Sequence, residues 1–207
     1  MDRFNIRSLS IGVALGLASA STTVMAQPKT FSATLSGPNE SPPVASAGTG
    51  FALFVYDNVA HTLSINVSFS GLTGTTTASH LHCCTAAALA GTAGVASTTP
   101  TFAGFPLGVT SGNYANLLDL TLASSWNPAF ITANGGTPAS AEAIFATGLN
   151  AGKAYLNIHT SFAGGGEIRG FVTTVPEPSS MLLMAAGLAA VGVIARRRRG
   201  VVSAPRA

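Results

Sequence analysis

The chain has 207 residues, of which 47% are hydrophobic and only 8% are charged, and its formal net charge is +3. Between residues 27 and 175, three basic and five acidic side chains leave a net charge of −2, so the basic excess lies at the two ends. The negative net charge means that the central region lacks the basic surface with which proteins bind DNA or RNA. No nucleic-acid partner is therefore expected.

The first 26 residues have the three-part pattern of a secretory signal peptide. Arg3 and Arg7 form a basic start, residues 8–21 are apolar and small, and a small-residue cleavage site precedes Gln27. We expect signal peptidase to remove this segment and the chain to be exported through the inner membrane.

Residues 27–174 are expected to form one domain built from short strands. Apolar and polar residues alternate without exception over residues 62–70, which predicts a half-buried strand. Leu63, Ile65, Val67 and Phe69 would then face the core. Further predicted elements are a turn at Asp57-Asn58, strands at 31–35, 51–56, 78–82, 117–122, 154–160 and 168–174, loops at 85–100 and 132–138, and one helix at 140–149. Short strands separated by turns favour an antiparallel β-sandwich.

Three histidines fall at alternating positions of two predicted strands. His80 and His82 share one face of their strand because side chains alternate with a period of two. His159 occupies the polar phase of its own strand. A glycine-rich turn follows, and if Ile168 faces the core, Glu167 and Arg169 share the face of His159. These side chains are therefore expected to converge.

Two interpretations of this group remain open. His80, His82, His159 and Glu167 could bind zinc or copper, since imidazole suits both metals. Alternatively, the histidines and the Glu167/Arg169 pair form a hydrogen-bonded network that fixes the last hairpin. The fourth histidine, His61, lies on a turn and is expected to be exposed.

Cys83 and Cys84 follow His82 directly and are the only cysteines. Their Cα atoms lie about 3.8 Å apart along a trans chain, below the usual span of a disulfide. A vicinal disulfide in an oxidising compartment is the favoured interpretation. Thiolate ligands that extend the histidine site and intermolecular bridges remain alternatives.

The C-terminal region combines an apolar run at 181–195 with a cluster of four arginines: Arg196, Arg197, Arg198 and Arg199. A helix of the length of the apolar run spans about 22 Å, short of a hydrocarbon core of about 30 Å. An ordinary single-pass anchor is one interpretation, and a short transmembrane helix that is inserted transiently and then processed is the favoured one. Residues 200–207 form a tail.

Pro176-Glu177-Pro178, the apolar run and the arginine cluster, in this order, resemble the PEP-CTERM sorting signal, here residues 175–199. The resemblance implies export, sorting to the cell envelope or surface, and processing by an exosortase, in an exopolysaccharide or biofilm context. Whether the mature form is anchored or released stays open.

Three stretches, "FSATLSGPNESPPVASAGTGFA", "SFSGLTGTTTASHLH" and "LNAGKAYLNIHTSFAGGGEIRG", resemble the CHRD domain in order, over residues 31–172. The resemblance implies a β-sandwich-like extracellular module. No nucleophile elbow, phosphate loop or paired catalytic carboxylates occur in the sequence. We therefore expect a surface-associated, non-enzymatic binding or structural module with an extracellular protein or polysaccharide ligand. The alternative is an extracellular zinc or copper protein, including a metal-dependent enzyme.

Overall fold

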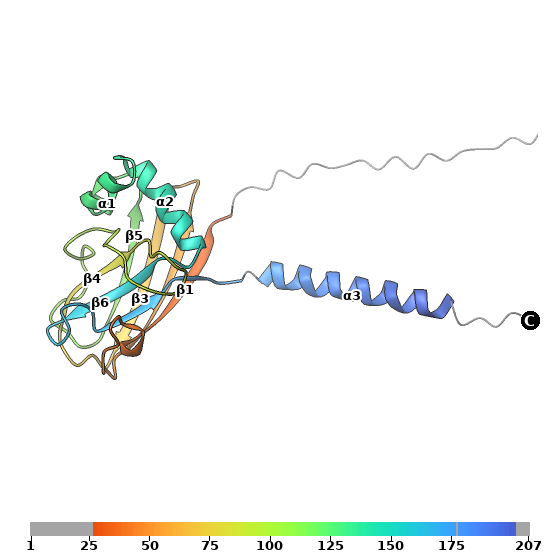
Figure 1. Cartoon of the computed structure of the whole chain (residues 1–207), viewed down its shortest axis with the longest axis horizontal. Helices are drawn as coiled ribbons and strands as arrows, with labels where there is room; N and C mark the ends of the chain where they lie inside the picture. The colour runs from red at the N-terminus through yellow and green to blue at the C-terminus, as the bar shows by residue number, and fades with distance from the viewer. Residues whose placement is uncertain (1–26, 177, 202–207) are drawn as a thin grey trace, which may run out of the picture.

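The computed structural model describes residues 27–176 and 178–201. The predicted signal peptide, Glu177 of the sorting signal and residues 202–207 of the tail lie outside the described residues. The described part is a β-rich domain followed by one long C-terminal helix (Figure 1).

Eight antiparallel strands form one sheet that curls into a half-barrel (Figure 1). The strands are β1 (Lys29–Ser36), β2 (Thr49–Asp57), β3 (Thr62–Ser70), β4 (Thr76–His82), β5 (Gly112–Asp119), β6 (Tyr155–Thr160), β7 (Ile168–Phe171) and β8 (Thr173–Thr174). Their order across the sheet is β4-β6-β7-β1-β2-β3-β5, and β8 pairs with β1. The all-β, antiparallel fold class is confirmed, and the strands belong to a single curled sheet.

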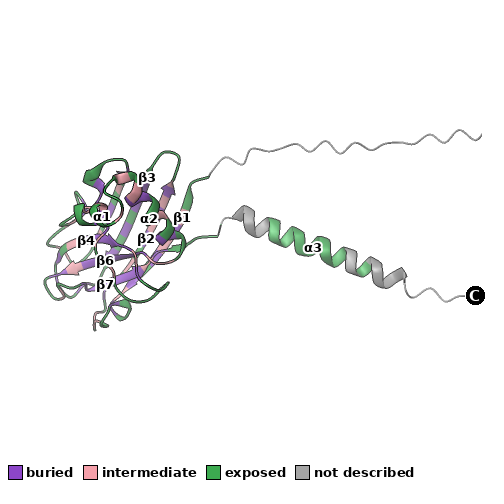
Figure 2. Cartoon of the chain, turned by 45° about the horizontal axis from the view of Figure 1, so that its top comes forward, coloured by how far each residue is buried: buried purple, intermediate pink, exposed green. Residues whose placement is uncertain are grey.

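The core lies on the inner side of this curl, where one face of every long strand is buried (Figure 2). In β3 the side chains of Leu63, Ile65, Val67 and Phe69 are at most 4% exposed, whereas Ser68 is exposed. Alternate residues of a strand point to opposite faces, so this pattern places the apolar set inside. The predicted phase of the strand is confirmed.

The outer edge of β4 is covered by residues 94–109, which run beside it without forming a regular strand. The Phe102 N–H donates to the Ser79 carbonyl at 3.0 Å, and the Gly108 N–H donates to the Thr76 carbonyl at 2.9 Å. An uncovered edge strand exposes a row of unpaired backbone groups. The covering segment therefore satisfies β4 and fixes the backbone of the strand that carries two of the histidines.

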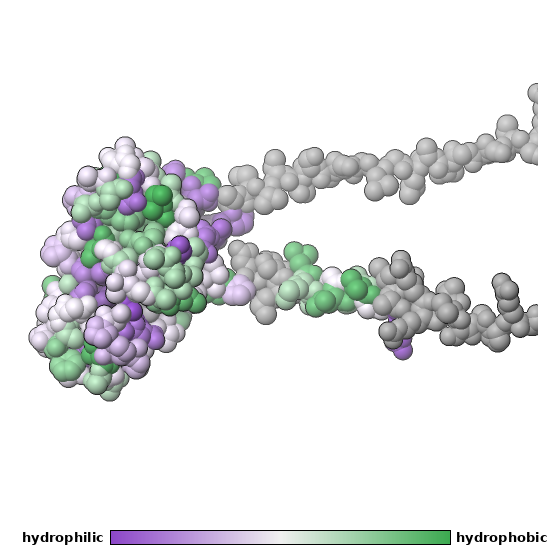
Figure 3. Space-filling view, viewed as in Figure 1, coloured by the Kyte–Doolittle hydropathy of each residue, from purple (hydrophilic) through white to green (hydrophobic). Residues whose placement is uncertain are grey.

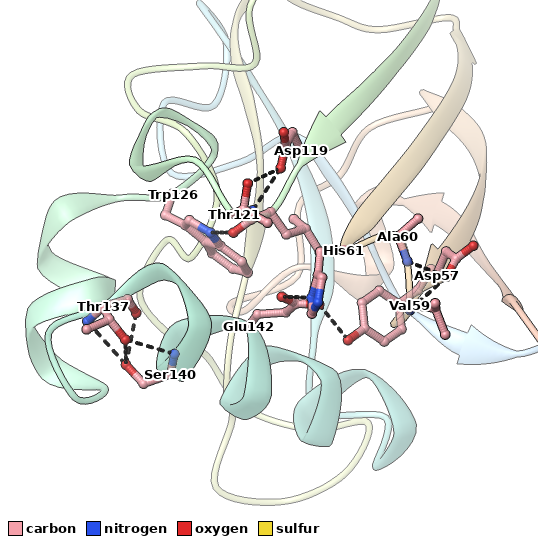
Figure 4. Close-up of polar contacts among 12 residues, drawn as sticks. Asp57, Val59, Ala60, His61, Asp119, Thr121, Trp126, Thr137, Ser140 and Glu142 are labelled. Carbon is pink, nitrogen blue, oxygen red and sulfur yellow. Dashed lines mark hydrogen bonds and ion pairs between the residues drawn. The ribbon is translucent and has the colours of Figure 1, made fainter. Parts of the chain in front are cut away.

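In the described part of the chain, helices and helical turns occupy five segments: η1 (Gly37–Asn39), η2 (Ala123–Ser125), α1 (Pro128–Ala133), α2 (Pro138–Asn150) and α3 (Pro178–Val201). Helix α2 contains the predicted helix 140–149 and starts two residues earlier. Its N-cap, Thr137, forms a capping box with Ser140 (Figure 4). Buried Phe145 and Leu149 pack α2 onto the core.

Helix α1 is an addition to the prediction, which has one helix at 140–149 and a loop at 132–138, of which residues 134–137 are a loop in the structure. The Asn127 side chain accepts a hydrogen bond from the Ala129 N–H, and Pro128 occupies the first helical position. Both features are ordinary helix start signals. They are present in the sequence, but the helix is too short to show a periodic apolar pattern.

The predicted strand 117–122 is wrong at both ends, since β5 covers Gly112–Asp119. The Asp119 carboxylate accepts hydrogen bonds from the Thr121 N–H at 2.9 Å and from its hydroxyl at 2.6 Å (Figure 4). This local turn replaces the ladder bonds that a longer strand would need. Strand β5 therefore stops at Asp119.

Helix α3 contains the predicted apolar run, and Pro178 is its first residue. Side chains at 183–193 are exposed, and apolar ones are visible along the helix in Figure 3. Among the described residues, no helix is both long and apolar enough to cross a membrane. The transmembrane part of the prediction for 181–195 is therefore not supported.

The arginine cluster lies in the last part of the same helix, and its four members are Arg196, Arg197, Arg198 and Arg199. The Arg196 side chain is exposed. The side chains of Arg197, Arg198 and Arg199 lie outside the described residues, although their backbone is helical. The apolar run and the arginine cluster thus follow one another on one continuous helix, in the order that the sorting signal requires.

Candidate metal centre

The histidine cluster comprises His80 and His82 on β4 and His159 on the neighbouring strand β6. In the β4–β6 ladder His82 lies opposite Tyr155, and His80 lies opposite Asn157. One ring nitrogen of each histidine lies within 4.8 Å of those of the other two. The three side chains converge, as the strand phase indicates. Within the described ranges, this is the only group of three or more potential metal ligands.

The ring of His80 meets the other two edge to face, and the rings of His82 and His159 are tilted by 38° with centroids 6.1 Å apart. The ring centroids of His80 and His159 are 4.6 Å apart, and those of His80 and His82 are 5.3 Å apart. His82 stacks on Tyr155, with centroids 4.6 Å apart and planes only 5° apart. These contacts hold the rings so that their free nitrogens can face a common point.

His82 and His159 are each bonded through one ring nitrogen to a backbone carbonyl. His82 Nδ1 is 2.9 Å from the Ala93 oxygen, and His159 Nδ1 is 3.0 Å from the Gly164 oxygen. A carbonyl accepts but never donates, so each bonded nitrogen carries the ring proton. Three ring nitrogens, His80 Nδ1, His82 Nε2 and His159 Nε2, are buried and have no partner.

The environment keeps all three imidazoles neutral at physiological pH. Burial lowers the pKa of His80 and of His82 to about 4, and the neighbouring histidines add to the effect on His80. Burial also lowers the pKa of His159. A neutral imidazole has one free lone pair, which is the form that binds a metal. The cluster therefore presents three lone pairs without a preceding proton loss.

Glu167 does not join the histidines, which corrects the predicted ligand set. Its carboxylate accepts hydrogen bonds from the Ser46 hydroxyl at 2.6 Å, the Thr160 hydroxyl at 2.6 Å and the backbone N–H groups of Thr73 and Gly74. Burial raises the pKa of Glu167, but these hydrogen bonds outweigh it and the pKa is lowered. The carboxylate is fully used in joining three segments of the chain.

The reason for this difference lies in the turn before β7. Gly166 has φ +129°, and β7 begins only at Ile168. Glu167 therefore precedes the strand, and the alternation that places Arg169 on the histidine face does not extend to it. Arg169 follows the expected phase and pairs with Asn157 across the β6–β7 ladder.

Arg169 has a different acidic partner from the one predicted. Its Nε lies 3.7 Å from the carboxylate of Glu40 and donates to the Asn39 carbonyl. Its guanidinium lies over the ring of Tyr155, 4.9 Å from the centroid. Sequence reasoning missed Glu40, whose only signal was its position in the first stretch similar to the CHRD domain. Burial raises the pKa of Glu40 to about 7, although Arg169 acts in the opposite direction.

Cys83 and Cys84 are joined in a vicinal disulfide, and neither is a free thiol. Both sulfur atoms pack against Gly148 of α2, where an added Cβ would lie less than 3.0 Å from each. The backbone N–H of Cys83 donates to the Gly94 carbonyl at 3.1 Å. In the folded chain the sulfurs therefore serve as packing against α2, and no thiolate extends the histidine cluster.

His61 has partners that the prediction of an exposed side chain did not foresee. Its Nδ1 lies 2.8 Å from Glu142 of α2, whose other oxygen accepts from the Tyr56 hydroxyl at 2.9 Å (Figure 4). The His61 side chain is still 49% exposed. It belongs to a separate contact between the β2–β3 turn and α2, away from the other three histidines.

Comparison with known proteins identifies the domain. The model of the CHRD domain family matches residues 31–172, which include all of β1 to β7 except the first two residues of β1, and the chain belongs to this family. No curated protein and no solved structure matches the chain.

The C-terminal region matches a second model, the PEP-CTERM protein-sorting motif, over residues 174–199. The matched residues include the Pro176-Glu177-Pro178 triplet, the apolar run and all four arginines of the cluster. The protein is therefore exported, sorted to the envelope or surface, and processed by an exosortase.

Proposed function

We propose that the exported CHRD domain is a non-enzymatic module that binds one transition-metal ion, Zn²⁺ or Cu²⁺, through His80, His82 and His159. Two observations carry the proposal together: one ring nitrogen of each histidine lies within 4.8 Å of those of the other two, and each histidine has one buried ring nitrogen without a partner. Protein structures seldom leave buried polar atoms without partners, and each one costs about 1–3 kcal/mol. One metal ion would satisfy all three.

The spacing and chemistry of the donors fit such an ion. Zinc–nitrogen bonds of about 2.0–2.1 Å in a tetrahedral site place the nitrogens roughly 3.3 Å apart, so small ring rotations would close the present spacing. Imidazole is a good ligand for both zinc and copper. The backbone carbonyls of Ala93 and Gly164 act as the outer partners that orient a metal-binding histidine.

The contacts disfavour the alternative in which the histidines serve only as a hydrogen-bonded network. Such a network needs side chains that donate to and accept from one another. None of the three free nitrogens has a partner, and Glu167, the expected acceptor, is bonded elsewhere. A surface role toward an extracellular protein or polysaccharide would use other residues and is compatible with metal binding.

Calorimetric titration of the exported protein, stripped of metal by a chelator, tests the proposal. We expect one saturable site for zinc or copper in the wild type and none in a His80→Ala/His82→Ala variant. His61→Ala is the matched control, because it removes a histidine outside the cluster and should retain the site. No saturable heat with either metal in the wild type, together with no metal found by elemental analysis, would overturn the proposal.

A further inference from the structure

Tyr155 contacts His82 in two ways. Its ring is 2% exposed and stacks on the His82 imidazole across the β4–β6 ladder. Its hydroxyl donates to the Ala93 carbonyl at 3.1 Å and accepts from the Ala93 N–H at 3.2 Å. The same carbonyl is the partner of His82 Nδ1 at 2.9 Å. Tyr155 therefore holds both the ring of His82 and the group to which that ring is bonded.

The position of the Ala93 carbonyl decides which nitrogen of His82 is free. In a neutral imidazole one nitrogen carries the proton and the other carries the lone pair. The carbonyl can only accept, so it requires the proton on Nδ1 and leaves the lone pair on Nε2. Residue 93 lies in a segment without regular helix or strand, where the Tyr155 hydroxyl bonds to both of its backbone polar groups.

We propose that Tyr155 is a positioning residue of the metal centre, which fixes the Nδ1–H form of His82 through Ala93 and so makes Nε2 the metal ligand. The inference rests on the proposed function. It also specifies the donor set, since the buried ring nitrogens without a partner are Nδ1 in His80 and Nε2 in His159. The centre thus has one Nδ1 and two Nε2 donors. Partners that orient a metal-binding histidine in this way typically change metal affinity by about 10- to 100-fold.

The test compares Tyr155→Phe with Tyr114→Phe in the exported protein. Tyr155→Phe keeps the stacked ring and removes only the hydroxyl. Tyr114 is a buried tyrosine on β5 whose hydroxyl also bonds to a backbone carbonyl, that of Ala103 at 3.2 Å, so it controls for the loss of a buried hydroxyl. We measure zinc affinity by competition with a chelator, and the protonation of His82 by ¹⁵N chemical shifts of labelled histidine.

We expect zinc affinity to fall by about tenfold or more in Tyr155→Phe and to stay within about twofold of wild type in Tyr114→Phe. In the metal-free protein the His82 signals should show a proton on Nδ1 in the wild type and a mixture of both forms in Tyr155→Phe. Unchanged affinity and an unchanged His82 signal in Tyr155→Phe would overturn the inference. If the wild type binds no metal, the proposed function fails, and the nitrogen shifts still decide whether Tyr155 fixes His82.

Discussion

His61 and Glu142 lie 81 positions apart in the chain, yet the His61 Nδ1 is 2.8 Å from the Glu142 carboxylate. The contact ties the β2–β3 turn to helix α2, and the Tyr56 hydroxyl bonds to the second oxygen of the same carboxylate at 2.9 Å. Glu142 is 5% exposed. A buried carboxylate with two partners is thus the main polar contact between α2 and the sheet in this region.

Replacing Glu142 with alanine should lower the free energy of unfolding by about 1–3 kcal/mol, because the Tyr56 hydroxyl loses its partner inside the core. His61→Ala should lower the free energy of unfolding by less than about 1 kcal/mol, since its side chain is 49% exposed and solvent weakens the contact with Glu142. Urea denaturation measures both. Equal losses in the two variants would show that the exposed contact, and not the buried one, carries the stability.

The strand phase of β3 gives a second prediction. Val67→Asp should prevent folding, because it places a charge with no partner among buried side chains. Ser68→Ala, on the exposed face one residue away, should change the free energy of unfolding by less than about 0.5 kcal/mol. Circular dichroism and urea denaturation distinguish the two. If both substitutions were equally damaging, the assigned core face of β3 would be wrong.

The pH dependence of stability should reveal Glu40. Burial raises its pKa from 4.5 to about 7 in the folded state, so the folded protein holds a proton that the unfolded chain releases. This favourable contribution is complete below pH 4.5 and is lost as the pH rises through 7. Between about pH 5 and 8 the free energy of unfolding of the wild type should therefore fall by on the order of 1–3 kcal/mol more than that of a Glu40→Gln variant.

Comparing the pH dependence of stability in the wild type and in Glu40→Gln separates the contribution of Glu40 from that of the histidines. The lowered pKa values of His80 and His82 destabilise both proteins alike as the pH falls from 6.5 toward 4. Only the difference between wild type and Glu40→Gln is attributed to the carboxyl group. Unfolding curves at several pH values supply it, and parallel pH profiles would contradict the prediction.

Processing at both ends can be read from the intact mass of the exported form. We expect a mature protein that begins at Gln27 and lacks residues 181–207, because the signal peptide and the sorting motif are both removal signals. Mass spectrometry of the precursor in a strain without exosortase is the control. A mature species that retains the arginine cluster would refute C-terminal processing.

Local patterns in the sequence were enough to predict the core face of β3, the α2 helix and the meeting of the three histidines. Each depends on a period of two or 3.6 residues that holds within one element. Glu167 was misplaced because Gly166, at φ +129°, ends the alternation just before β7. The His61–Glu142 contact had no local signal, because it depends on how α2 packs across the sheet.

The donors of the histidine cluster come from two strands that are far apart in the sequence but adjacent in the sheet. The centre is incomplete until β6 has paired with β4, so an unfolded or truncated chain offers at most two neighbouring histidines. A metal ion held by all three would act as a clamp between an early and a late segment of the chain. Metal occupancy would then show that the sheet is completely assembled. Free metal at about 100 times the dissociation constant would raise the free energy of unfolding of the domain by about 2.7 kcal/mol.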